Sequence, residues 1–223
     1  MSYVLRYAGL LDEARKECDV ALALDPGFNG LRSCAIPFIM ASDYTGAQRY
    51  ISLAKSPGFA ALLRMRIALR TGNTAAVLAD TDAAVKSGYT AGVKVEQVFF
   101  RACVTHAPEF GRVAAKLEAD PVASHDPELL YQSAEALAFC GQADAAVSLL
   151  TKAIKGNHCS YPAMDKDPLF DSIRLRPEFV ELRTTAIQCQ QNFLAHREQV
   201  QGTLRPTRLA GPHVTGGPDE SRR

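Results

Sequence analysis

Short amphipathic runs separated by polar turns fill residues 1–156 of the chain. In the run 59–70, apolar side chains recur at the spacing of one helix face. Comparable runs precede and follow each turn, so the pattern indicates helix, turn and helix several times over. We therefore predict an all-α fold made of helix pairs, with almost no strand.

Four stretches share one pattern, in which a turn is followed by a second helix with apolar residues at i, i+4 and i+7. The equivalent residue near the start of this second helix is Ala14, Ala47, Val77 or Ala146 in the four stretches. These positions are 33, 30 and 69 residues apart. The last spacing has room for a further unit, with Phe110, Val113 and Leu117 on one helix face. Fixed periods of this kind are typical of repeat proteins, and here they predict about five units.

The turns carry residues that end helices. Gly9, Gly72 and Gly141 stand at the turns of three units, where glycine supplies the left-handed conformation of a helix C-terminus. The second unit lacks this glycine and has Pro37 inside its first helix. Because proline cannot donate the helical hydrogen bond, we expect a kink or break at that point.

These features resemble the tetratricopeptide repeat (TPR) family, whose unit of about 34 residues has glycine at the turn, alanine early in the second helix and proline at the end. The first unit, from Gly9 to Pro26, matches best, although Cys18 stands where the family prefers an aromatic residue. The resemblance covers residues 1–156. It implies an α-solenoid that winds as a right-handed superhelix, with the first unit truncated.

The resemblance also implies a binding groove, because fixed positions of the first helices line the concave face in that family. By register these positions fall at Asn29, Arg32, Ile36 and Met40, at Phe59, Leu62, Arg66, Leu69 and Arg70, and at Glu128, Tyr131 and Glu135. The candidates for peptide contact are Arg32, Phe59, Leu62, Arg66, Arg70, Tyr131 and Glu135. Arginine side chains there would pair with carboxylates of an extended peptide, and aromatic ones would anchor apolar side chains.

The pattern changes from residue 157. Asp167 and Pro168 are typical of a helix start, and Pro177 opens a long helix through about residue 200. We interpret residues 157–200 as a C-terminal capping segment and residues 201–223 as a disordered tail. The capping segment resembles the one that closes repeat regions in some bacterial signalling proteins, where the repeats follow a serine/threonine kinase, a nucleotide cyclase or a winged-helix DNA-binding domain.

Composition narrows the function classes. The 25 Lys and Arg residues balance 24 Asp and Glu residues, which argues against a general binder of nucleic acid or membrane surfaces. The sequence has no phosphate-binding loop, no kinase motif and no metallohydrolase or nucleophile-elbow motif. We therefore expect a protein that is not an enzyme and has no cofactor.

The six cysteines are widely spaced, and no Cys-x-x-Cys pair occurs. We interpret most of them as small buried thiols, which predicts a reducing, cytoplasmic location. A metal-dependent enzyme that uses Cys103, His106, His158 and Cys159 stays open as an alternative.

The leading prediction is a non-catalytic module that binds a peptide or protein segment in the concave groove. The alternative is the C-terminal docking or sensing part of a larger bacterial serine/threonine kinase or transcription regulator. The half-repeat at Met1 favours this alternative, because it leaves an apolar face uncovered. Self-association of that face would instead give a homodimer.

Overall fold

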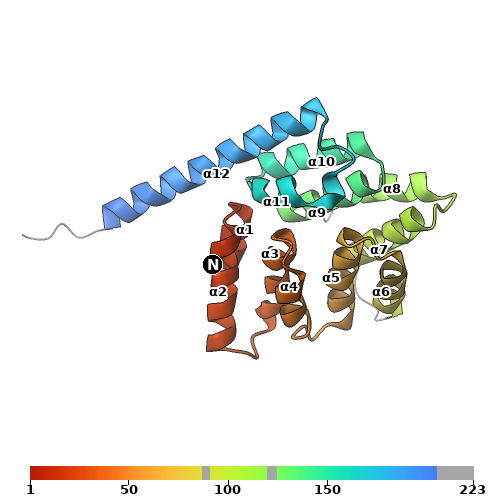
Figure 1. The fold of residues 1–223 in the computed structure, drawn as a ribbon, viewed down its shortest axis with the longest axis horizontal. Helices are drawn as coiled ribbons and strands as arrows, with labels where there is room; N and C mark the ends of the chain where they lie inside the picture. The colour runs from red at the N-terminus through yellow and green to blue at the C-terminus, as the bar shows by residue number, and fades with distance from the viewer. Residues whose placement is uncertain (87–90, 120–124, 205–223) are drawn as a thin grey trace, which may run out of the picture.

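The computed structural model describes residues 1–86, 91–119 and 125–204, and all regular structure in these ranges is helical (Figure 1). The predicted all-α class is confirmed for this part of the chain. Each helix in these ranges is too short or too polar to cross a lipid bilayer.

Consecutive helices pack against each other as pairs. In the first half the elements are α1 (Ser2–Tyr7), α2 (Leu11–Leu24), the 3-10 helix η1 (Asn29–Cys34), α3 (Ala35–Met40), α4 (Tyr44–Ile51), α5 (Pro57–Arg70) and α6 (Thr74–Lys86). The second half has α7 (Ala91–Val104), α8 (Phe110–Glu118), α9 (Pro127–Phe139), α10 (Ala143–Lys155), α11 (Tyr161–Lys166), the 3-10 helix η3 (Pro168–Phe170) and α12 (Pro177–Leu204). The described ranges thus hold five helix pairs, from α1–α2 to α9–α10.

The same backbone turn joins the two helices of every pair. One residue in each turn has a left-handed φ between 52° and 78°, namely Gly9, Ser42, Gly72, His106 and Gly141. The amide of the next residue donates to the carbonyl five positions earlier, over 2.8 to 2.9 Å, as in a Schellman motif. The turn that lacks glycine in the second unit is therefore built with Ser42 instead.

Pro37 shapes the second pair as expected. The chain runs as a 3-10 helix up to Cys34 and becomes α-helical only at Ala35, so the proline lies in the first turn of α3. Its missing N–H would have no intrahelical partner there. The break in the first helix is thus part of the fold.

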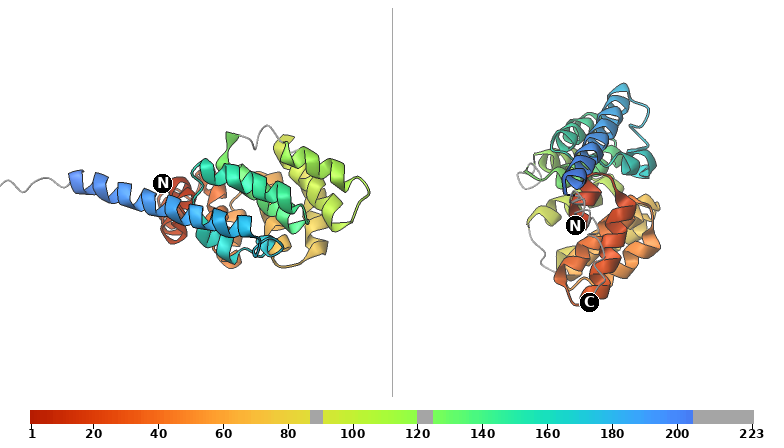
Figure 2. Two further views of the ribbon diagram at one scale, coloured as in Figure 1. Left: turned by 90° about the horizontal axis from the view of Figure 1, so that it is seen from above. Right: turned by 90° about the vertical axis from the view of Figure 1, so that its left-hand side faces the viewer.

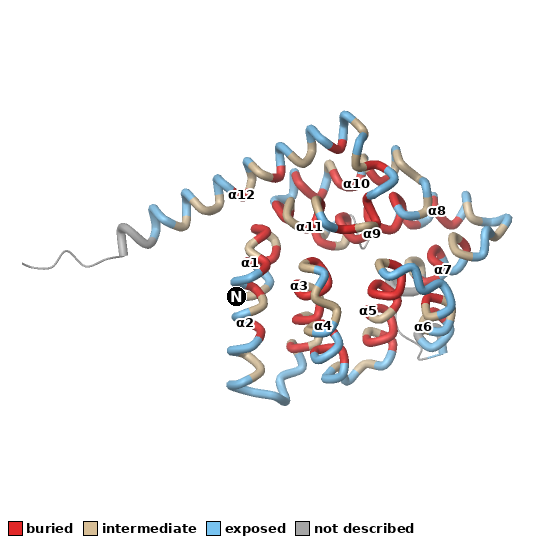
Figure 3. Tube along the Cα trace, in the orientation of Figure 1, coloured by how far each residue is buried: buried red, intermediate tan, exposed pale blue. Residues whose placement is uncertain are grey.

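The second half of the chain lies across the ends of the first. The pairs α1–α2, α3–α4 and α5–α6 stand side by side, and α9, α10 and α11 pass over their upper ends (Figure 1). One hydrophobic core joins the halves, because Met40 and Leu62 belong to the same cluster as Tyr131 and Phe170. A second cluster, which includes Phe38, Tyr50 and Leu63, fills the space between the helices of the first half, so buried segments occur in both halves (Figure 3).

The C-terminal segment packs on the last pair and then projects beyond it. The predicted cap at Asp167 is present, since its side chain accepts a hydrogen bond from Leu169 N. Asp126 caps α9 in the same way and accepts one from Glu128 N. The long helix α12 extends past α1 and α2 (Figures 1 and 2) and continues to Leu204, four residues into the predicted tail. The rest of that predicted tail lies outside the described residues.

The prediction of free thiols is wrong. All six cysteines form disulfides, which pair Cys18 with Cys34, Cys103 with Cys140, and Cys159 with Cys189. The pairing was missed because each bond joins residues that only the folded arrangement brings together.

Candidate functional site

Four of the seven predicted groove residues converge on one inner surface between the two halves. Arg66, Arg70, Tyr131 and Glu135 line a common cavity, together with Ile36, Met40 and Glu128 from the same register and with His158. The cavity measures about 10 Å³. This is roughly the space of a single water molecule, so the surface is closed to a peptide.

Ion pairs between the halves fill this inner surface. Arg6 of α1 donates from Nε and Nη2 to the two carboxylate oxygens of Glu128 on α9, over 2.5 and 2.7 Å. Arg66 of α5 pairs with Glu96 of α7 over 2.7 Å. Buried pairs are specific because removal of one partner leaves an uncompensated charge, and here they join segments up to 122 residues apart.

A buried triad of Arg70, Glu135 and Asp167 connects α5 to α9 and to the start of η3. Asp167 accepts from Arg70 Nε and Nη2 over 3.0 and 2.5 Å, and from the amide of Leu169. Within this triad Glu135 makes a single contact, from its Oε2 to Arg70 Nη2 over 2.9 Å. Since one guanidinium faces two carboxylates and Asp167 holds the better hydrogen bonds, the proton resides on Glu135.

Burial agrees with that assignment. It raises the pKa of Glu135 to about 8, with the Asp167 carboxylate adding to the rise and Arg70 opposing it. Burial acts to lower the pKa of Arg70, but the carboxylates of Glu135 and Asp167 outweigh it and raise that pKa. Arg70 therefore stays charged throughout the physiological range.

His158 and Tyr131 stack beside the triad. Their ring centroids are 4.5 Å apart. The His158 ring also contacts the Tyr7 ring, with 5.0 Å between the two centroids. Burial, assisted by the nearby Arg6 guanidinium, lowers the pKa of His158 to about 3, so the imidazole is neutral. The Tyr131 hydroxyl and both imidazole nitrogens have no hydrogen-bond partner among the described residues.

These findings correct the predicted groove. Arg66, Arg70, Tyr131 and Glu135 do lie on one surface, but that surface is not an open groove, because all four side chains are buried. Leu62 is buried in the main core, also contrary to the prediction. The remaining two candidates are half-buried, and the Arg32 guanidinium lies 5.4 Å above the Phe59 ring.

The inner surface could have been anticipated from one sequence signal. Arg64, Arg66 and Arg70 interrupt an otherwise apolar run over residues 59–70, and a charge on the buried face of such a helix needs a partner. The partners Glu96, Glu135 and Asp167 are distant in sequence, and nothing local identifies them.

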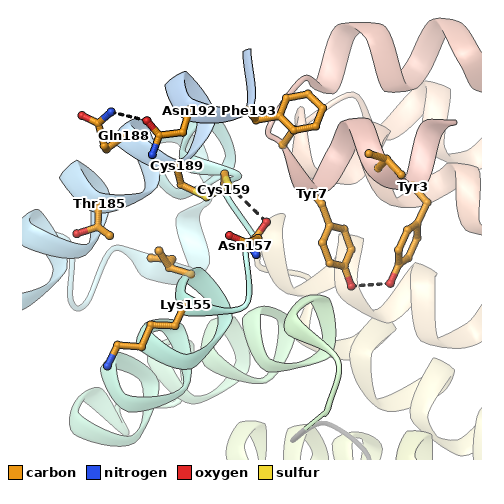
Figure 4. Close-up of a pocket in the computed structure, with 13 residues that line it drawn as sticks. Tyr3, Tyr7, Lys155, Asn157, Cys159, Thr185, Gln188, Cys189, Asn192 and Phe193 are labelled. Carbon is orange, nitrogen blue, oxygen red and sulfur yellow. Dashed lines mark hydrogen bonds between the residues drawn. A yellow bond between two sulfur atoms is a disulfide. The ribbon is translucent and has the colours of Figure 1, made fainter. Parts of the chain in front are cut away.

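An open groove lies elsewhere, between α1, the loop after α10, and α12 (Figure 4). This terminal groove has a volume of about 600 Å³, and most of its wall is apolar. Its lining residues are Tyr3, Val4, Tyr7, Ala8, Ile154, Lys155, Asn157, Cys159, Thr185, Gln188, Cys189, Asn192 and Phe193. None of the residues predicted to contact a peptide lines this groove.

The two walls of the terminal groove differ in chemistry. The α1 wall is aromatic, and its two tyrosines are joined by a hydrogen bond of 2.5 Å between their hydroxyls. Gln188 and Asn192 of α12 present amides on the opposite wall, where Gln188 Nε2 donates to Asn192 Oδ1 (Figure 4). Among the described residues that line the groove, only Lys155 is charged.

The backbone and one disulfide hold the walls at a fixed separation. Cys159 N donates to Tyr7 O over 2.6 Å, and Gln190 Nε2 of α12 donates to Ala8 O over 2.9 Å. The bond from Cys159 to Cys189 ties the loop to α12. The groove is therefore a preformed feature of the fold.

The metal alternative loses its sulfur ligands. Cys103 and Cys159 are each in a disulfide, so neither offers a thiolate to a cation. Within the described ranges, no group of three or more His, Cys, Asp or Glu side chains is placed to hold a metal ion. No family model, curated protein or solved structure matches the chain.

Proposed function

We propose that the chain is a non-catalytic binding module of TPR-like helix pairs, which holds a segment of a partner protein in the terminal groove. The groove itself carries the proposal. Its volume of about 600 Å³ falls in the range of ligand sites in proteins, and its open wall offers apolar contact area that no described residue covers.

The inner surface supports a structural role instead. Its arginines are committed to Glu128, Glu96, Glu135 and Asp167 within the chain. A peptide carboxylate would have to displace buried ion pairs, and each broken pair would cost about 3–5 kcal/mol. The inner ion pairs therefore hold the two halves together, and binding is assigned to the outer groove.

The lining predicts the kind of segment that fits. Tyr3, Val4 and Phe193 supply apolar contacts for one or two anchor side chains. Asn157, Gln188 and Asn192 carry amides that can donate to and accept from the backbone of an extended segment. Lys155 favours an acidic residue near the anchor. The module would serve this role alone or as the docking part of a larger regulator.

Selection from a random peptide library displayed on phage tests the proposal. Two matched variants locate the binding: Val4→Glu lies in the groove and Val180→Glu outside it, and the two valines are 50% and 51% exposed. We expect enriched peptides with apolar anchors, bound by wild type and Val180→Glu alike.

Binding to Val4→Glu should weaken by roughly tenfold or more, because a buried charge replaces an apolar contact. Thermal unfolding followed by circular dichroism confirms that both variants stay folded. The proposal fails if no sequence is enriched, or if the enriched peptides bind Val4→Glu as well as they bind wild type.

A further inference from the structure

Every cysteine of the chain has its Cα within disulfide-bonding distance of the Cα of one other cysteine. The Cα–Cα separations are 5.7 Å for Cys18 and Cys34, 5.8 Å for Cys103 and Cys140, and 5.4 Å for Cys159 and Cys189. Disulfides in proteins have Cα separations of about 4.4–6.8 Å, most often near 5.5–6 Å. All six residues meet this condition at once.

The three bonds lie at three different junctions of the fold. Cys18 of α2 joins the first helix pair to Cys34, at the start of the second pair. The bond from Cys103 of α7 to Cys140, at the end of α9, joins the fourth pair to the fifth. The third bond joins the loop that follows the fifth pair to α12. Each bond thus links successive structural units, whose mutual interfaces stabilise a stacked array.

Packing alone does not account for these positions. A free cysteine that serves as a small apolar residue is among the most buried residue types. Cys103, Cys140 and Cys189 are only half-buried, and each of them has its partner beside it. Metal binding does not account for them either, because no third ligand joins any pair among the described residues.

We infer that the chain carries three structural disulfides and works in an oxidising compartment, where its partner must also be found. This replaces the cytoplasmic location expected when the cysteines were taken as thiols. Stable disulfides are rare in the reducing cytoplasm and are formed and kept in secreted and periplasmic proteins.

The oxidation has a defined electron acceptor. For each bond, two thiols lose two protons and two electrons, and a sulfur–sulfur bond forms. A thiol–disulfide oxidase takes the electrons by exchange, so that its own disulfide is reduced to two thiols. Three rounds of this exchange oxidise the whole chain.

Thiol trapping in the source cells tests the inference directly. Cells are quenched in acid, and free thiols are alkylated in denaturant before and after reduction. We expect no alkylation of the chain before reduction and six alkylated cysteines after it. Any thiol alkylated before reduction overturns the inference, and six such thiols would return the chain to a reducing compartment.

A second experiment tests the pairing without depending on the source cells. Purified protein refolds in a mixture of reduced and oxidised glutathione, and digestion then identifies the linked peptides. We expect only the links 18–34, 103–140 and 159–189. Reduction should accelerate cleavage of the folded protein by protease by roughly a hundredfold, because it frees the junctions. Other links, or equal cleavage rates of the oxidised and reduced protein, contradict the inference.

Discussion

Glu135 and His158 should give the stability of the protein a distinctive pH dependence. Burial raises the pKa of Glu135 from 4.5 to about 8, so the folded protein keeps a proton that the unfolded chain has lost. Stability from this group is present below pH 4.5 and is lost as the pH rises towards 8. Burial lowers the pKa of His158 from 6.5 to about 3, so its contribution has the opposite sign and is lost as the pH falls below 6.5.

The two groups offset each other over part of this range. One proton of difference changes the free energy of unfolding by about 1.4 kcal/mol per pH unit. As the pH rises from 4.5 to 6.5, the contribution of Glu135 to the free energy of unfolding falls by about 2 kcal/mol and that of His158 rises by about 2 kcal/mol, so the two changes cancel. Between pH 6.5 and 8, Glu135 is the one of these two groups whose contribution still changes, so the stability of the wild type should fall by about 2 kcal/mol.

Substitutions separate the two contributions. Glu135→Gln keeps a neutral amide against Arg70 and should remove the fall in stability above pH 6.5. Only the effect of His158 then remains, so the stability should rise by about 2 kcal/mol as the pH increases from 4.5 to 6.5. His158→Gln should instead leave a continuous fall of about 4 kcal/mol between pH 4.5 and 8.

Urea unfolding followed by circular dichroism, at constant ionic strength, measures these free energies. Glu181→Gln, an exposed position on α12, controls for the loss of a carboxylate. If the curve of Glu135→Gln runs parallel to that of the wild type, the proton is not on Glu135 and the account of the triad is wrong.

Two further predictions concern the contacts between the halves, and urea unfolding measures both. Gly9→Ala should destabilise the protein more than Gly141→Ala. Both substitutions cost about 1–2 kcal/mol because the backbone has a left-handed φ. A Cβ at position 9 would also lie 2.6 Å from Gln190 Nε2 and 2.8 Å from Cys159 O, whereas no such atom lies within 4 Å of a Cβ at position 141. Equal losses would show that α12 and the loop do not pack on this turn. Arg6→Leu should cost about 3–5 kcal/mol because it leaves Glu128 buried and unpaired, and the double variant with Glu128→Leu should recover most of that loss. No recovery in the double variant would refute the pairing.

Local features of the fold were predictable from the sequence. The turns at Gly9, Gly72 and Gly141, the break at Pro37 and the caps at Asp126 and Asp167 all depend on residues within a few positions of one another. Their conformations follow from backbone sterics and short-range hydrogen bonds, so one segment is enough to infer them.

Features that depend on the closure of the array were not predictable. The register brought Arg70 and Glu135 to a common surface, but it could not show that α9 and η3 would cover that surface. The terminal groove has the same origin, because it needs α1, the loop after α10, and α12 to meet. Each disulfide likewise needs two separate elements to pack together. These ion pairs and disulfides join residues from 16 to 97 positions apart that lie in different helices or loops, and no local pattern encodes them.

The central claim is that a partner segment occupies the terminal groove, and a footprint of the bound complex tests it most directly. Hydrogen–deuterium exchange of the oxidised protein is measured with and without the best peptide from the library selection. The account predicts slower exchange in α1, in the loop at residues 156–160 and around residues 185–193 of α12. Protection confined to the helices that carry Arg32 and Phe59, or no protection at all, would contradict it.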